Sequence, residues 1–509
     1  MSGLLWRRFE TLAQARPEAP ALFQGDQTVT FGRLHRQALA LAGELARRGL
    51  TPGDRCLVWA ANSPQMAEAI LAVWRAGAII ALVGDEAPLS HFEHAAQVTQ
   101  PALAVVDEPL ANAASRVFDG PVLVLGEPAR DDAEALRAVV HDHEPASIFF
   151  TSGSTGRPKG ATQSHANLAA ACGMVAEHLG LRTDDRILCP IPWSFDYGYG
   201  QLLSTLLMGV PQVLPVARNP FALCEAIEAH RPTVFASLPS ILALLIRGVS
   251  PLRQTDLSSI RLLMNTGGAI SPAIFAEALE LFAQADVSLN YGMTETYRSA
   301  GLPPHLARER PESVGFAYPG VALSVVRDDG SPCDPGELGE IVHRGTGAFL
   351  GYWGDAKATA GVLRPDPAWP HAGVAAPKAV FSGDLGWRDE QGFLVIKGRR
   401  DRLIKSMGVR VSPDEVEALI RGSGLVRDVV VVGLPHELMG EKVAAAVIPR
   451  EGEPDPTAQL KLFARQAMSP HMQPRDYRTL DAFPLTPNGK TDFQRLREMF
   501  DEARRHVRA

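Results

Sequence analysis

Apolar runs of strand length alternate with segments of helical spacing along the first half of the chain. The run Cys56–Ala60 is followed by apolar positions at three-to-four spacing between Met66 and Trp74, and then by the run Ala78–Val83. Such alternation predicts strand, helix and strand in turn. Comparable apolar runs recur at Leu103–Val106, Val122–Leu125, Ser147–Thr151, Val213–Leu214, Thr233–Ala236 and Ile260–Met264. We therefore expect an α/β fold of helix-covered, mainly parallel sheets.

The pattern changes twice toward the end of the chain. Residues 364–380 are rich in proline and alanine, which predicts a loop or flexible excursion. A polar joint follows Gly398, and after it we expect a compact α+β domain with a helix from Pro413, strands over 428–433 and 443–448, and a helix near 457–468. We therefore predict a large N-terminal domain over residues 1–398, a hinge over 399–402 and a small mobile C-terminal domain over 403–509.

Composition narrows the class of protein. The chain has 509 residues, too many for one core, and its 46% apolar content is typical of a globular protein. The net charge of −7 gives no general attraction to nucleic acid or to an anionic membrane. Five widely spaced cysteines indicate neither a zinc site nor a disulfide framework. No window approaches the about 18 uninterrupted apolar residues of a membrane helix, so we expect a cytoplasmic protein without membrane insertion. We expect it to be a monomer or a homodimer.

The stretch Phe149–Lys159 carries the clearest chemistry. It reads Phe-Phe-Thr-Ser-Gly-Ser-Thr-Gly-Arg-Pro-Lys, so an apolar run leads into a loop of hydroxyls and glycines that ends on cations. Glycines let backbone N–H groups approach phosphate oxygens, and hydroxyls add donors. A Walker A loop requires Gly-Lys-Ser/Thr opening a helix, whereas Pro158 here predicts that Lys159 lies on a loop. On composition alone, a flexible surface loop is an equally good interpretation.

The order of residues favours the phosphate loop. Thr-Ser-Gly-Ser-Thr-Gly-Arg-Pro-Lys-Gly resembles the signature of the adenylate-forming enzymes, which include acyl-CoA synthetases, adenylation domains of peptide synthetases and luciferases. Five further stretches resemble that superfamily in its order. The sequences of Phe195–Gly198 and Thr294–Pro311 most resemble those of stand-alone bacterial acyl-CoA ligases associated with exopolysaccharide export.

The resemblance implies a nucleotide site. Tyr291 would stack on adenine, Thr294 would contact the α-phosphate, Glu295 and Thr155 would hold Mg²⁺, and Asp384 with Arg399 would bind the ribose. A carboxylate suits Mg²⁺. In isolation, however, a segment such as Asn290–Thr296 or Ser382–Gly386 is more often a plain turn. The full set implied for ATP or AMP is Thr151, Ser152, Gly153, Ser154, Gly156, Gly267, Gly268, Ala269, Asn290, Tyr291, Gly292, Thr294, Asp384 and Arg399. The catalytic set adds Thr155, Lys159, Glu295 and Lys490.

The resemblance also implies a two-step reaction. Lys490 would reach the substrate carboxylate and α-phosphate while an acyl-adenylate forms from ATP with release of pyrophosphate. The small domain would then turn about Asp401, with Lys405, Gly408 and Arg410 lining the hinge and thiol channel. Because we find no carrier domain before Ala509, we expect the thiol on another molecule. Coenzyme A is the simplest acceptor, a separate carrier protein is the alternative, and a nucleotide-binding sensor without catalysis is a third possibility.

The substrate pocket is the part of the site that the sequence specifies least. By resemblance it includes Trp193, Asp196, Tyr199, Gly200 and Gly267. In amino-acid-activating relatives an Asp at the position of Asp196 pairs with the substrate ammonium, and a buried carboxylate needs such a partner. In acyl-activating relatives the same Asp can cap a turn. We favour an acyl substrate and keep the amino acid as the alternative.

Overall fold

The computed structural model describes residues 4–127, 140–152, 158–268, 270–369, 371, 373–407, 409–436, 439–450, 455–485 and 491–508, with the backbone alone at 152, 401, 409–410 and 503–508. These residues form two compact units. The first comprises residues 1–324, 342–382 and 390–394, and the second comprises 325–341, 383–389 and 395–509. The second unit contains the whole of the predicted C-terminal domain, and the predicted domain boundaries stay a prediction.

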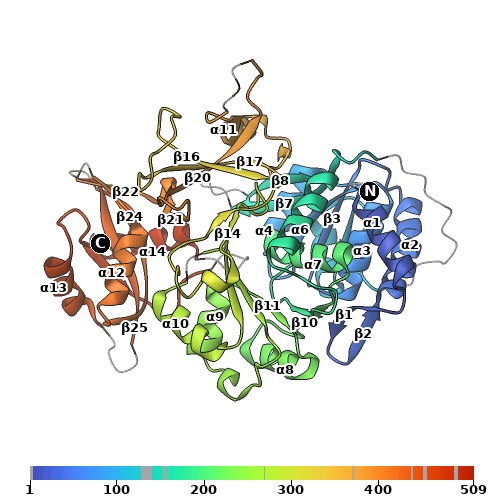
Figure 1. Cartoon of the computed structure of the whole chain (residues 1–509), viewed down its shortest axis with the longest axis horizontal. Coiled ribbons are helices and arrows are strands. Elements are labelled where there is room, and N and C mark those ends of the chain that lie inside the picture. Colours follow the sequence, from blue (N-terminus) through green and yellow to red (C-terminus); the bar gives the residue numbers. More distant parts are fainter. Residues whose placement is uncertain are drawn as a thin grey trace. The chain divides into compact units, whose positions relative to one another are not determined.

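A seven-stranded sheet organises the N-terminal part of the first unit (Figure 1). Its central pairs β7/β4, β4/β3, β3/β5 and β5/β6 are parallel, and β7/β8 and β8/β18 are antiparallel. The strand order is β18-β8-β7-β4-β3-β5-β6. The strands are β3 (Arg55–Ala60), β4 (Ile79–Gly84), β5 (Leu103–Val106), β6 (Val122–Val124), β7 (Pro145–Ser152), β8 (Pro158–Ser164) and β18 (Gly351–Tyr352).

A nine-stranded sheet forms the rest of the core of this unit. Its order is β15-β14-β13-β12-β11-β9-β10-β1-β2, and the run from β13 to β1 is parallel throughout. The strands are β1 (Pro20–Gln24), β2 (Gln27–Thr30), β9 (Ile187–Leu188), β10 (Gln212–Leu214), β11 (Val234–Ser237), β12 (Leu262–Asn265), β13 (Asp286–Tyr291), β14 (Ala300–Gly301) and β15 (Phe316–Ala317). The predicted α/β class with mainly parallel sheets is confirmed.

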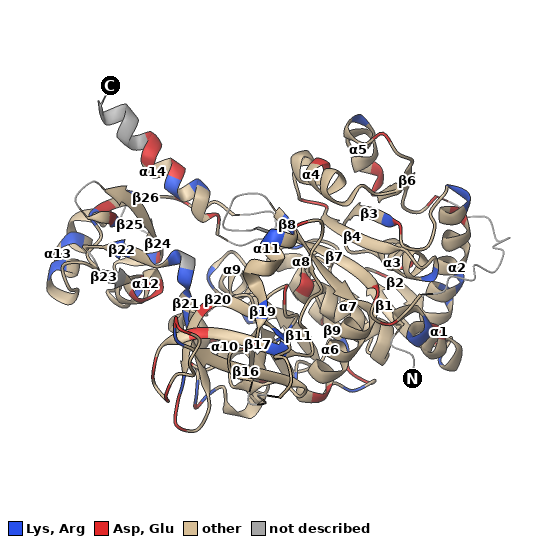
Figure 2. Cartoon of the chain, turned by 90° about the horizontal axis from the view of Figure 1, so that it is seen from above, with Lys and Arg blue, Asp and Glu red and all other residues tan. Residues whose placement is uncertain are grey.

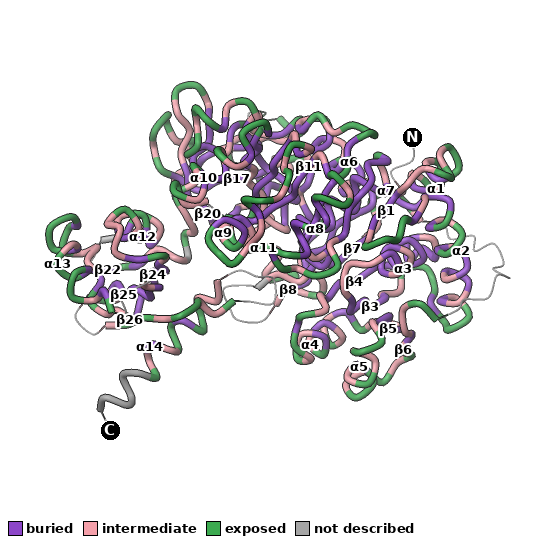
Figure 3. The backbone as a smooth tube through the Cα atoms, turned by 90° about the horizontal axis from the view of Figure 1, so that it is seen from below, coloured by how far each residue is buried: buried purple, intermediate pink, exposed green. Residues whose placement is uncertain are grey.

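Most helices of the first unit pack apolar residues against these sheets, so that buried residues concentrate inside the unit (Figure 3). Their starts follow from the sequence. Ser63 caps α3 by accepting from the backbone N–H of Met66, and Pro64 fills the first turn. The helices are α1 (Leu5–Ala15), α2 (Phe31–Arg47), α3 (Pro64–Arg75), α4 (Leu89–Thr99), α5 (Ala111–Val117), α6 (His165–His178), α7 (Asp196–Met208), α8 (Pro220–His230), α9 (Pro239–Arg247), α10 (Pro272–Leu281) and α11 (Ala356–Val362).

Five strands carry the chain through the boundary between the units. They form a sheet of order β16-β17-β20-β19, with β21 paired to β20. Their bounds are β16 (Val321–Val326), β17 (Gly339–Gly345), β19 (Leu363–Pro365), β20 (Lys378–Arg388) and β21 (Leu394–Arg399). The predicted proline-rich loop over 364–380 is therefore wrong at both ends, because Leu363 and Arg364 pair with Val380 and Ala379 in an antiparallel ladder. Pro365 can end an edge strand, where its missing N–H does no harm.

The remaining elements of the second unit form an α+β fold. Strands β23-β22-β25-β24 are antiparallel, and β26 joins β25 in parallel. Helices α12 and α13 cover one hydrophobic cluster, and α14 supplies Leu496 and Phe500 to another. Outward-facing residues of α14 carry both charges, with Arg495 paired to Glu498 and Glu502 (Figure 2). The elements are β22 (Ile404–Ser406), β23 (Val409–Val411), α12 (Pro413–Gly422), β24 (Val426–His436), β25 (Gly440–Pro449), α13 (Thr457–Ala467), β26 (Asp476–Thr479) and α14 (Phe493–Arg508).

Candidate active site

The phosphate loop connects two paired strands. Thr151 of β7 faces Lys159 of β8 in an antiparallel ladder, and Ser152 faces Pro158. Lys159 therefore lies in a strand and not on a loop as predicted, because Pro158 favours extended backbone and the ladder continues it. Predicted residues Gly153, Ser154, Thr155 and Gly156 lie outside the described residues, as does Lys490 of the second unit.

Lys159 belongs to a polar cluster that brings distant segments together. Its ammonium lies 5.2 Å from the centre of the Tyr352 ring. The Tyr352 hydroxyl donates to Glu295 Oε1 at 2.6 Å, and Glu295 is buried. Pairing of Tyr352 with Ala161 of β8 fixes the ring beside the hairpin. The structure thus joins the hairpin lysine and the predicted Mg²⁺ carboxylate through a tyrosine that the sequence did not single out.

The turn after β13 lies at the carboxyl end of the parallel strands, where open α/β sheets bind ligands. Asn290 is bonded within the protein, because its Nδ2 donates to the carbonyl of Asn265 at 3.2 Å and its Oδ1 accepts from Tyr318 at 2.5 Å. Tyr291 is half-buried at the end of the strand. Gly292 leaves no room for a side chain, since a Cβ would lie 2.8 Å from the carbonyl oxygen of Tyr297.

The end of β12 lies beside this turn. The Thr266 hydroxyl donates to the carbonyl of Asn290 at 3.0 Å, which ties the two strand ends together. Gly267 has φ +82° and is exposed, as is Gly268. A positive φ suits glycine and exposes backbone for a ligand. Ala269 lies outside the described residues.

Asp196 is paired within the protein. Its Oδ2 lies 3.3 Å from a guanidinium nitrogen of Arg298, and its Oδ1 accepts from the Thr294 hydroxyl at 3.1 Å. The side chains of Arg298 and Asp196 are only 4% and 7% exposed. The carboxylate therefore has its counter-charge from the chain itself and needs none from a substrate.

Three further predicted pocket residues lie in the core, whereas Gly267 is exposed. Trp193 is fully buried and donates through Nε1 to Gln212 at 3.2 Å. Tyr199 is fully buried and its hydroxyl lies 2.8 Å from that of Ser147. Gly200 allows close packing, because a Cβ there would lie 2.6 Å from the Tyr297 hydroxyl. Tyr199 and Gly200 belong to α7, Trp193 precedes it, and all three residues are buried.

A buried histidine is hydrogen-bonded to the segment that follows Glu295. His343 Nδ1 lies 3.0 Å from the Ser299 hydroxyl and Nε2 lies 2.9 Å from the carbonyl of Thr346. Ser299 in turn donates to the Thr296 hydroxyl at 2.9 Å, next to Glu295. Burial lowers the pKa of His343 to about 4, and the bond to Thr346 opposes this only in part.

Loss of stability at acid pH should depend on His343. Because its folded pKa lies below the unfolded value of 6.5, the unfolded state binds the proton first as the pH falls. We expect the free energy of unfolding to fall from about pH 6.5 toward pH 4, with His343 contributing up to about 1.4 kcal/mol per pH unit. Chemical denaturation should show a flatter slope for His343→Gln than for wild type. The exposed His305→Gln is the matched control, and an unchanged slope in His343→Gln would contradict the prediction.

In the second unit, the two predicted ribose residues are brought together. Asp384 Oδ1 lies 3.4 Å from a guanidinium nitrogen of Arg399, and Gly383, with φ +71°, directly precedes Asp384. Lys405 is exposed, and its backbone N–H donates to Glu441 at 2.8 Å. The side chains of Asp401 and Arg410 are not described, and Gly408 lies outside the described residues.

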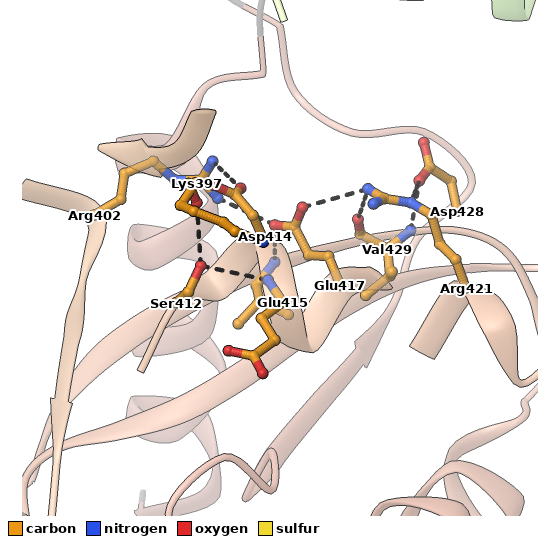
Figure 4. Close-up of polar contacts among 10 residues, drawn as sticks. Lys397, Arg402, Ser412, Asp414, Glu415, Glu417, Arg421, Asp428 and Val429 are labelled. Atoms are coloured by element: carbon orange, nitrogen blue, oxygen red, sulfur yellow. Dashed lines mark hydrogen bonds and ion pairs between the residues drawn. The ribbon is translucent and has the colours of Figure 1, made fainter. Parts of the chain in front are cut away.

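An ion-pair network surrounds the predicted hinge within this unit (Figure 4). Arg402 donates to Asp414 at 2.9 Å and to Glu417 at 3.1 Å, while Arg421 lies 3.4 Å from the other oxygen of Glu417. Ser412 caps α12 and donates to the carbonyl of Lys397 at 3.4 Å. Helix α12 is therefore bonded to the chain on both sides of Asp401.

Glu417→Ala should destabilise the second unit strongly. Glu417 is buried, also accepts from the backbone N–H of Val431 at 2.9 Å, and desolvation raises its pKa against the opposing pull of Arg402 and Arg421. Its removal takes the shared partner from two guanidinium groups, which keep Asp414 and Asp428, and takes the acceptor from the buried Val431 N–H. We therefore expect a cost of about 1–3 kcal/mol. Thermal unfolding should show this loss. The exposed Glu415→Ala on the same helix should be close to wild type, and equal Tm values for the two variants would contradict the prediction.

The described residues contain neither a metal-binding cluster nor a membrane-spanning helix. Among the described residues, no group of three or more His, Cys, Asp or Glu could hold a metal ion by itself. In the part of the chain that the structure describes, no helix is long and apolar enough to cross a membrane.

The structure defines an α/β protein in which the hairpin of β7 and β8 lies beside the buried carboxylate of Glu295. The chain matches the AMP-binding enzyme family over residues 9–353 and the AMP-binding enzyme C-terminal domain over residues 415–490. The chain therefore belongs to the AMP-binding enzyme family, the adenylate-forming superfamily that its motifs resemble. The finer resemblance to ligases of exopolysaccharide export stays a prediction.

Known proteins that are similar to this chain over more than nine-tenths of its length include two CoA-thioester-forming enzymes and an amide bond synthetase. It is 31% identical over 487 residues to a feruloyl-CoA synthase of an Amycolatopsis species, covering 94% of this chain and 95% of the relative. It is 31% identical over 473 residues to the 2-succinylbenzoate–CoA ligase of Geobacillus kaustophilus, covering 92% of each. The solved amide bond synthetase of Marinactinospora thermotolerans is 29% identical with a TM-score of 0.84, covering 97% of this chain and 99% of that one.

Proposed function

We propose that this chain is an AMP-forming acyl-CoA ligase. A carboxylate oxygen of the acid attacks the α-phosphorus of ATP, and the bond to the bridging oxygen of pyrophosphate breaks. The thiol of coenzyme A, having lost its proton, then attacks the acyl carbon, and the bond to the AMP oxygen breaks. Family membership and the two CoA ligases among the relatives support both steps. The observation that carries the proposal is the cluster of Lys159, Tyr352 and Glu295 beside the phosphate hairpin.

The residues of the first unit would bind the nucleotide by charge and backbone donors. Thr151, Ser152, Gly153, Ser154, Gly156 and Lys159 would hold the β- and γ-phosphates, and catalysis here is positioning and charge neutralisation. Tyr291, Gly292, Gly267, Gly268 and Ala269 would contact the adenosine. Asn290 would orient the turn from within, since its amide is already bonded to Asn265 and Tyr318.

The chemistry of the donors suits Mg²⁺. This ion binds proteins through one or two carboxylates together with substrate phosphates, and Glu295 offers a carboxylate whose orientation the Tyr352 hydroxyl fixes. Glu295 and Thr155 would hold the ion. When bound, Mg²⁺ neutralises charge on the phosphates.

The second unit would contribute the ribose and thiol steps. Asp384 and Arg399, paired at 3.4 Å, would bind the ribose hydroxyls. Lys490 would stabilise the charge that develops during adenylation, since a lysine ammonium carries three donors. Asp401 would be the pivot for the second step, with Lys405, Gly408 and Arg410 near the incoming thiol. A hinge of a few residues can absorb such a change.

The internal pairing of Asp196 favours an acid without an ammonium group. Arg298 already supplies the counter-charge that an amino acid would bring, so a second cation would compete with a fixed, buried one. We therefore propose a carboxylic acid with an uncharged body as the substrate class. Trp193, Tyr199, Gly200 and Gly267 would shape the surroundings of this acid.

The test uses matched acids with ATP, Mg²⁺ and purified protein, with and without coenzyme A. One pair is 3-phenylpropanoate and phenylalanine, which differ only by the amine, and aryl and aliphatic acids extend the panel. Mass spectrometry should detect AMP and a CoA thioester from at least one amine-free acid. Pyrophosphate exchange without thioester would point to a carrier protein or another acceptor. Preference for the amine-bearing member of each pair would contradict the proposed substrate class, and no exchange with any acid would contradict adenylation.

A further inference from the structure

A buried ion pair lies against the predicted phosphate end of the nucleotide site. Asp196, the first residue of α7, holds Arg298 at 3.3 Å on one oxygen and the Thr294 hydroxyl at 3.1 Å on the other. The carboxylate is thus hydrogen-bonded directly to Thr294, the residue proposed to contact the α-phosphate. The same carboxylate cannot be moved to solvent, since only 7% of its side chain is exposed.

Arg298 is held as firmly as Asp196. Its guanidinium lies 4.6 Å from the centre of the Tyr197 ring and 5.3 Å from that of Tyr297, within reach of cation–π attraction. It also donates to the backbone carbonyl of Tyr297. Tyr297 itself has φ +58°, which places its ring beside Arg298 and against Gly200. The guanidinium is therefore a preorganised cation and not a mobile surface group.

We propose that Arg298 is a positioning residue for adenylation: by neutralising Asp196 it lets phosphate bind beside Thr294. The inference rests on the proposed function. An uncompensated carboxylate in a buried setting repels an approaching phosphate far more than one in water does. The pair also fixes the Thr294 side chain, because the Thr294 hydroxyl donates a hydrogen bond to Asp196. Arg298 thus acts through Asp196 and Thr294 and need not contact the substrate.

The experiment compares two ligands that differ only by the phosphate. Calorimetry would give the Kd of AMP and of adenosine for wild type, Arg298→Met, Asp196→Asn and the double variant. Arg298→Met should weaken AMP about tenfold or more through charge repulsion, with adenosine changed less than about twofold. Asp196→Asn, which keeps an oxygen acceptor for Thr294 and removes the charge, should bind AMP as tightly as wild type or more tightly. The double variant should recover AMP binding to within about threefold of wild type.

Opposite signs for the two single variants separate charge from packing. A merely structural pair would weaken AMP and adenosine together in both variants, and the double variant would not recover. That result would overturn the inference, as would an unchanged Kd for AMP in Arg298→Met. If a single variant does not fold, the double variant, which leaves no unpaired buried charge, still decides: AMP binding more than about threefold weaker than in wild type would overturn the inference. A wild-type protein that binds neither AMP nor adenosine would contradict the proposed function itself, and the inference with it.

Discussion

Replacing Lys490 by alanine should abolish formation of the acyl-adenylate while thioester formation from a preformed acyl-adenylate continues near the wild-type rate. The charge that develops at phosphorus exists only in the first step, so an ammonium that stabilises it matters only there. Loss of one such preorganised donor costs about 10²–10³ in rate. Pyrophosphate exchange measures the first half-reaction, and transfer from synthetic acyl-adenylate to coenzyme A measures the second.

The matched control is Lys461→Ala, which removes an exposed lysine from α13 in the same unit. It should leave both half-reactions unchanged. An equal loss of both half-reactions in Lys490→Ala would show that this lysine has another role, such as folding of its loop or contact with the thiol.

Replacing Glu295 by glutamine should lower the rate of adenylation about a hundredfold and raise the Mg²⁺ concentration that half-saturates it. Glutamine keeps an oxygen that can accept from the Tyr352 hydroxyl, so the change removes charge and leaves the local packing in place. A carboxylate is a better ligand for Mg²⁺ than an amide. Pyrophosphate exchange over a range of Mg²⁺ concentrations measures both effects.

Tyr352→Phe tests the other half of that contact. It keeps the Glu295 charge and the ring beside Lys159 but removes the 2.6 Å hydrogen bond. We expect a loss of roughly tenfold to a hundredfold, since one hydrogen bond to a charged group contributes about 1.5–3 kcal/mol and about 1.4 kcal/mol is a factor of ten in rate. If Glu295→Gln and wild type show the same dependence on Mg²⁺ concentration, the prediction that Glu295 binds Mg²⁺ is contradicted.

The fold was readable from the sequence wherever the pattern was long and local. The apolar runs at Leu103–Val106 and Cys56–Ala60 became β5 and most of β3, because buried parallel strands need continuous apolar residues. Prediction failed where pairing decides the structure. Lys159 was expected on a loop, yet the ladder with β7 extends the strand through it. Residues 364–380 have a loop-like composition, yet their ends pair as β19 and β20.

Site residues divide in the same way. Glu295 and the phosphate loop could be predicted because their motifs are contiguous in the sequence. Tyr352 and Arg298 were not assigned roles, since Tyr352 lies 57 positions from Glu295 and Arg298 lies 102 positions from Asp196. Neither spacing is a pattern that a single sequence displays. Glu417 was missed for another reason, because a glutamate on a helix is usually solvated and only burial shows otherwise.

The sequence by itself determined the class of fold, the family and the motifs that name the nucleotide chemistry, because each depends on residues that are close together along the chain. The tertiary structure alone decided which of these residues have partners. It showed that Asp196 is already neutralised by Arg298 and that Glu295 is oriented by Tyr352. Charge balance in a buried site depends on distances across the core, and those distances exist only after the strands and helices have packed.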